Sequence, residues 1–102
     1  MAGKVSWMRA IAGFRPIGSH TTIADMSSVQ TLTPPNESAR KILVQATAQD
    51  VRYTLDGTTP NATTGFVLGS QDPPLMIIVE KGLTLKLIEE SSGAKLAYQW
   101  GQ

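Results

Sequence analysis

The chain has one histidine, His20, and histidine is the side chain that most often serves as a general base. Nucleophilic catalysis requires a nucleophile within hydrogen-bonding reach of a base. Ser19 is adjacent in the sequence, but neighbouring residues of an extended chain point in opposite directions. A zinc site requires three or four protein ligands, which one histidine and no cysteine do not supply. We therefore interpret His20 as a surface residue and predict no catalytic residue and no metal site.

The acidic residues are scattered along the chain, mostly beside turn residues. Glu89 and Glu90 are adjacent, so a strand would place them on opposite faces, where they make a poor acid–base pair. Asp56 and Asn61 offer oxygen ligands for calcium, but their spacing differs from that of an EF-hand loop. Because Asp and Asn favour turns, we interpret them as turn residues. There is no glycine-rich phosphate loop, and we predict no cofactor.

The clearest structural pattern is residues 51–68, which predict a β-hairpin. Residues 51–55 alternate apolar and polar side chains with a period of two, which is typical of a half-buried strand. Asp56 and Gly57 form a strong turn signal, because glycine adopts positive φ without steric cost. Pro60 lacks a backbone N–H and interrupts the ladder. Residues 64–68 are then the returning strand.

Further strands are predicted on both sides of this hairpin, each bounded by turn residues. Their ranges are residues 29–33, 42–47, 75–80, 83–88 and 94–100. Residues 75–80 are apolar at both alternating sets of positions, which predicts a central strand. Six or seven short strands separated by turns predict an all-β fold, a single antiparallel β-sandwich, with a small barrel as the alternative.

Residues 1–28 differ in character from the rest. They combine large apolar residues with glycines and a proline, and they hold three basic residues before the first acid, Asp25. Residues 5–12 suit a short helix of about two turns, limited by the flanking glycines. We predict that residues 1–28 form an extended N-terminal arm and that residues 29–102 form the β-sandwich domain.

Composition restricts the partners of the protein. The 102 residues include nine basic and eight acidic side chains, so the net charge of +1 provides no general attraction for nucleic acid. No apolar run approaches the roughly 20 residues needed to span a bilayer, and we expect no membrane partner. A small domain without disulfides is marginally stable alone, which favours oligomerisation or docking on a larger assembly.

The aromatic residues fall into two groups. Tyr53, Phe66 and Tyr98 occupy strand positions compatible with a core. Trp7 and Trp100 lie near the ends of the sequence, where either packing within the domain or anchoring at an interface would account for them.

Five short stretches of the sequence carry a resemblance to known families. Residues 51–63 resemble the "YTLDGTTPT" hairpin of the chitobiase C-terminal, fibronectin-like β-sandwich modules. Together with residues 44–47, 65–68, 88–90 and 93–96, they are similar to a group of short virion proteins of tailed phages. The similarity covers roughly residues 40–100. The chain departs from the pattern at Leu55, where an acid is often found.

The resemblance implies a noncatalytic structural protein of a phage particle, which we expect to decorate or cement the capsid. The expected partners are the major capsid protein or other virion subunits, with a homo-oligomer on the particle; the expected location is the virion, after synthesis in the bacterial cytoplasm. The predicted partner-binding residues are Trp7, Met8, Arg9, Ile11, Phe14, Arg15 and Trp100.

Three alternatives remain. The protein could act at the head–tail junction, or it could be a carbohydrate-binding or spacer module with Trp100, Tyr98 or Trp7 as sugar platforms. No motif supports a glycan ligand. A small hydrolase is the third alternative, and the missing site geometry disfavours it.

Overall fold

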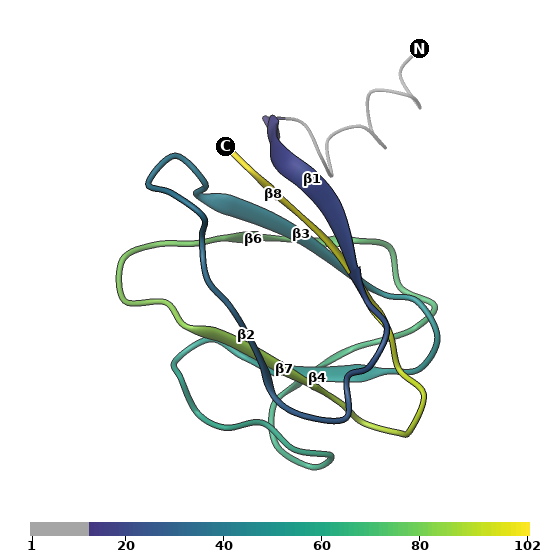
Figure 1. Ribbon diagram of the computed structural model, residues 1–102. Coiled ribbons are helices and arrows are strands. Elements are labelled where there is room, and N and C mark those ends of the chain that lie inside the picture. The colour runs from purple at the N-terminus through teal and green to yellow at the C-terminus, as the bar shows by residue number, and fades with distance from the viewer. Residues whose placement is uncertain (1–12) are drawn as a thin grey trace, which may run out of the picture.

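The computed structural model of the protein describes residues 13–102, which form two antiparallel β-sheets packed as a sandwich (Figure 1). The predicted all-β class and sandwich architecture are confirmed. Within this range there are eight strands, one or two more than predicted. They are β1 (Pro16–Ile23), β2 (Gln30–Leu32), β3 (Lys41–Ala46), β4 (Val51–Thr54), β5 (Phe66–Leu68), β6 (Leu75–Ile78), β7 (Leu85–Glu89) and β8 (Leu96–Gly101).

Sheet A has the strand order β1-β8-β3-β6. Its inner face follows from the alternation in β3, where Ile42, Val44 and Ala46 are buried and the residues between them are not. Residues paired across an antiparallel ladder share a face. Ile42 pairs with Trp100 on one side and with Ile77 on the other, so these side chains also face inward.

Sheet B has the order β2-β7-β4-β5 and supplies the opposite wall of the core. Leu85 and Leu87 of β7 are buried with Lys86 between them, as the alternation predicts. The predicted hairpin is present, because β4 pairs with β5 from Val51↔Leu68 to Tyr53↔Phe66. Consecutive strands otherwise cross mostly between the sheets, so the core joins residues that are far apart in the sequence.

One apolar cluster lies between the sheets. Its buried residues are nearly inaccessible to water, and they come from the loops and from every strand except β1 and β2. The buried members are Met26, Ala39, Ile42, Val44, Ala46, Val51, Leu68, Ile77, Leu85, Leu87, Ala94, Leu96 and Trp100. Among the described residues, every buried side-chain nitrogen or oxygen has a hydrogen-bond partner.

Two predictions are wrong, one about where the N-terminal arm ends and one about the position of residues 75–80 in the sheet. Residues 16–23 belong to the sandwich as β1, which pairs with β8 from Pro16↔Gly101 to Ile23↔Leu96, so the predicted arm of residues 1–28 extends too far. The strand in residues 75–80 is β6, an edge strand, although it was predicted to be central. Among residues 13–102 no further layer covers its outward apolar side chains, and Ile78 is 55% exposed.

An irregularity in β1 explains why its sequence does not look like a strand. The register shifts between Ile17 and Thr21, and Gly18 has φ +72°. The side-chain amide of Gln99 on β8 donates hydrogen bonds to the carbonyl oxygens of Ile17 and Gly18, both at 3.1 Å. These bonds satisfy backbone groups that the bulge removes from the ladder.

Gly65 allows the hairpin to close, and its replacement tests that geometry. Its φ is +119°, and an added Cβ would lie 2.9 Å from the Tyr53 carbonyl oxygen. We expect Gly65→Ala to lower the free energy of unfolding by about 3 kcal/mol, because backbone strain and overpacking add. Gly93 has φ +95° and open space around it, so Gly93→Ala should cost only about 1 kcal/mol. Urea denaturation measures both; equal losses would contradict the close approach to Tyr53.

Candidate partner-binding surface

The chain enters the sandwich beside its C-terminal residues. Arg15 and Gln102 exchange two backbone hydrogen bonds, each 2.8 Å long, which continue the β1–β8 ladder by one pair. The neighbouring Phe14 ring lies against Gly101, where an added Cβ would come within 2.4 Å of two ring carbons. Gly101 is buried because this ring covers it. A residue with a side chain at position 101 would therefore displace Phe14.

Phe14 covers the outer face of sheet A. Trp100 faces the core, and successive strand residues alternate between faces, so Gly101 faces outward. Lys41 pairs with Gly101 on the next strand and shares this outer face. Its ammonium group donates a 2.5 Å hydrogen bond to the carbonyl oxygen of Gly13. Phe14 thus contacts β8 through its ring, and the Lys41 side chain of β3 contacts Gly13.

The predicted partner-binding residues separate into three groups. Trp7, Met8, Arg9 and Ile11 lie outside the described residues, and their role stays a prediction. Phe14 is half-buried against Gly101, and Arg15 is exposed. Trp100 is 8% exposed within the core, so of its two interpretations the structure shows packing in its own domain.

The outer face of sheet A carries an apolar patch that the sequence pattern does not predict. We call Leu43, Met76 and Ile78 the outer patch. Leu43 pairs directly with Met76, and Ile78 pairs with Lys41, so the three side chains share the face next to Gly13. The four strands of sheet A contain no Asp or Glu. The signal for it in the sequence is the apolar character of both faces in residues 75–80, but that pattern predicts a central strand instead.

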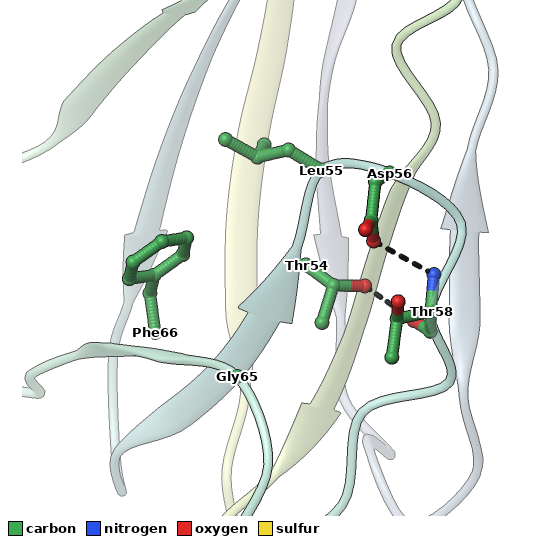
Figure 2. Close-up of a pocket in the computed structure, with 6 residues that line it drawn as sticks. All are labelled: Thr54, Leu55, Asp56, Thr58, Gly65 and Phe66. Atoms are coloured by element: carbon green, nitrogen blue, oxygen red, sulfur yellow. Dashed lines mark hydrogen bonds between the residues drawn. The ribbon is translucent and has the colours of Figure 1, made fainter.

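The hairpin forms a second surface feature, a hollow of about 470 Å³ at the end of β4. Figure 2 shows Leu55 and Phe66 reaching to one side of the strand, while Asp56 and Thr58 lie on the other. Phe66 is 62% exposed, and its ring is tilted at 41° to that of Tyr53 with a centroid distance of 5.5 Å. The hollow therefore combines one exposed aromatic ring with the polar groups of a turn.

The predicted turn residues Asp56, Gly57 and Pro60 occupy the expected places in this hairpin. Asp56 accepts a 3.0 Å hydrogen bond from the Thr58 backbone N–H, Gly57 has φ +87°, and Pro60 is buried. Hydrogen bonds from the Thr58 side chain, and then from its backbone N–H, hold the pKa of Asp56 below its usual 3.8. Asp56 is accordingly an ionised turn residue at neutral pH.

Arg52 connects three parts of sheet B on its outer face. Its Nε donates to Glu90 at 2.7 Å, and its Nη2 lies 2.6 Å from the same carboxylate oxygen. Its Nη1 also donates to the Gly65 carbonyl oxygen at 2.9 Å. One guanidinium thus joins β4, the end of β7 and the residue before β5, and these contacts fix the relative positions of three elements.

The metal-binding residue types are dispersed over the described part of the chain. His20 lies exposed in β1 beside the bulge. Within residues 13–102 no group of three or more His, Cys, Asp or Glu side chains is close enough to bind one metal ion. In the same range, no helix is long and apolar enough to cross a membrane.

Comparison with known proteins adds no relative: the chain matches no protein-family model, no curated protein and no solved structure.

The packing of the Phe14 ring against Gly101 predicts that the paired amides of Arg15 and Gln102 are protected from hydrogen exchange. Phe14→Ala should speed hydrogen exchange at the Arg15 and Gln102 amides, because the ring shields their two hydrogen bonds from water. It should also lower the free energy of unfolding by about 1–2 kcal/mol, less than a fully buried phenylalanine contributes. Phe66→Ala removes an equal ring at the far hairpin and is the control. Exchange that rises equally in both variants would exclude a local effect of Phe14.

The pKa of Asp56 gives a second prediction. NMR titration should place it below 3.8, and Thr58→Val should raise it, because the variant removes the hydroxyl that hydrogen-bonds to the carboxylate. Since the folded-state pKa is lowered, the contribution of Asp56 to stability is present above pH 3.8 and is lost as the pH falls through the folded-state value. Asp25, whose pKa is lowered by Ser27 in the same way, should not respond to Thr58→Val. An unchanged Asp56 titration would rule out the role of the hydroxyl.

Proposed function

We propose that the protein is a noncatalytic structural component of a tailed-phage particle that binds and stabilises the capsid. The observation that carries this proposal is the position of the sequence blocks that resemble phage virion proteins. Residues 51–58, 65–68 and 88–90 lie in or beside neighbouring strands β4, β5 and β7. Arg52 of the first block contacts Gly65 of the second and Glu90 of the third. Three of the five matching stretches therefore form one packed unit, while residues 44–47 and 93–96 lie in or beside β3 and β8 of the other sheet.

The proposed attachment is through the N-terminal residues. Residues 1–15 include Trp7, Met8, Ile11 and Phe14 together with Lys4, Arg9 and Arg15, and they contain no acid. Burial of the apolar side chains, at about 25 cal/mol per Å², would offset the cost of ordering the segment on a partner. The basic side chains would pair with acidic groups at the rim of the partner's groove. Many copies on one lattice would then add avidity to a modest individual affinity.

The alternatives receive less support. Trp100 lies in the core, and Tyr98 is partly buried on the same inner face, so neither offers an open platform for a sugar ring. The carbohydrate-binding alternative would then rest on Trp7 or on the hollow beside Phe66. The head–tail junction remains the other location within the particle, and it differs from the capsid surface in the expected number of copies.

Particle composition tests the proposal directly. We expect the gene to lie in a phage or prophage genome, and particles of that phage purified by density gradient should contain this chain in many copies, counted by quantitative mass spectrometry. A count of about a dozen or fewer would instead indicate the head–tail junction, where symmetry limits the number of sites. Purified particles without the chain would overturn the proposal.

The role of the arm is tested on particles that lack the chain. Added recombinant protein should bind them, and Trp7→Ala should weaken binding about 30-fold, the equivalent of about 2 kcal/mol for a buried tryptophan anchor. Val67→Asp places a charge on the exposed face of β5 and is the control. Co-sedimentation measures both affinities. If Trp7→Ala binds as well as the unchanged protein, the arm is not the attachment.

A further inference from the structure

The two sheets have four edge strands, and three of them carry features that oppose pairing with another chain. β1 contains a bulge and Gly18, and β2 and β5 are each three residues long. Bulges and short strands are among the devices by which natural sheets protect their edges. β6 is instead a regular strand of four apolar residues. Of the four edges in residues 13–102, the edge of β6 alone has neither a bulge nor a three-residue length.

The ladder with β3 shows which backbone groups of β6 face this edge. The ladder continues one residue past β6, where the Val79 N–H donates a 2.7 Å hydrogen bond to the Arg40 carbonyl oxygen. Hydrogen-bonded and non-hydrogen-bonded pairs alternate along an antiparallel ladder. Ile77 is therefore bonded to β3, as Val79 is, whereas Met76 and Ile78 turn their N–H and C=O groups away from β3. Among the described strands, none pairs with β6 on that side.

Two copies of this edge fit each other in one antiparallel register. A twofold axis at Ile77 pairs Met76 of each copy with Ile78 of the other, so all the outward backbone groups of both residues are used. An axis at Met76 would set Ile78 opposite Pro74, which has no N–H. An axis at Ile78 would set Met76 opposite Glu80, whose carbonyl oxygen already accepts the 3.0 Å hydrogen bond of the following turn.

The same register brings the two outer patches together. Met76 and Ile78 lie on the outer face, and directly paired side chains on one face of a sheet contact each other. Leu43 lies beside Met76 on β3 and extends the contact within each copy. β6 has no charged residue, so no like charges meet across the pair. Backbone and side chains of this edge are thus both complementary to a second copy of themselves.

We infer that the protein self-associates through β6, so that the four strands of sheet A in each copy join into one continuous antiparallel sheet. The contact is isologous and closes at a dimer. Main-chain hydrogen bonds hold the two edges, and the paired side chains select the register. The interface is small, so we expect a dissociation constant in the micromolar range. The inference does not rest on the proposed function, because it concerns the purified protein.

Sedimentation of the full chain tests the dimer. From about 1 μM to about 1 mM, the unchanged protein should pass from monomer to dimer. Ile78→Lys should weaken association at least about tenfold, because a lysine on an edge strand opposes pairing. Thr31→Lys places the same charge on β2, an edge strand of sheet B, and is the control. Circular dichroism checks that both variants are folded. A monomer at every concentration, or equal weakening by both variants, would overturn the inference.

A compensating pair tests the register. Adding Met76→Glu to Ile78→Lys should restore association, because each glutamate would then face a lysine of the other copy. With the axis at Ile78 the two lysines would instead meet, and the double variant would stay monomeric. Failure of the double variant to associate would therefore contradict the axis at Ile77.

Hydrogen exchange tests the same interface without any substitution. The Met76 and Ile78 amides should exchange more slowly in concentrated than in dilute solution, when measured by NMR. The Ile77 amide is bonded to β3 in either state and is the internal control. Met76 and Ile78 amides that do not respond to concentration would refute pairing through β6. Particles found to lack the chain would overturn the proposed function and leave these results standing, so the two proposals fail separately.

Discussion

Burial of the facing sides of the two sheets is the interaction on which the rest of the structure depends. Val44 of sheet A and Leu85 and Leu87 of sheet B are at most 1% exposed. A register slip of one residue would turn these side chains to water, so the core fixes the register of every strand it includes. The same alternation then assigns Leu43 and Met76 to the opposite face. The apolar surface of sheet A is thus a consequence of how its core is built.

Much of the fold was predictable, because alternation reports which side chains meet the core. Residues 51–68 combine alternation with the Asp56–Gly57 turn, and both the strands and the hairpin are present. The position of β6 was not predictable in the same way. Its apolar residues on both faces indicate low polarity but not which strands form its hydrogen-bonded neighbours, and among the described strands β6 pairs with β3 alone. Only the three-dimensional arrangement distinguishes an apolar edge from a central strand.

The N-terminal boundary of the sandwich and the burial of Trp100 show a different limit of prediction from the sequence. β1 contains Gly18 and a bulge, which interrupts the period of two, and its missing backbone bonds come from Gln99, about 80 residues away. No local pattern contains that partner. Trp100 lies near the end of the sequence, yet it is paired with Ile17 and Ile42 on the inner face. Nearness to a terminus does not indicate exposure when the terminal strand is an interior strand of its sheet.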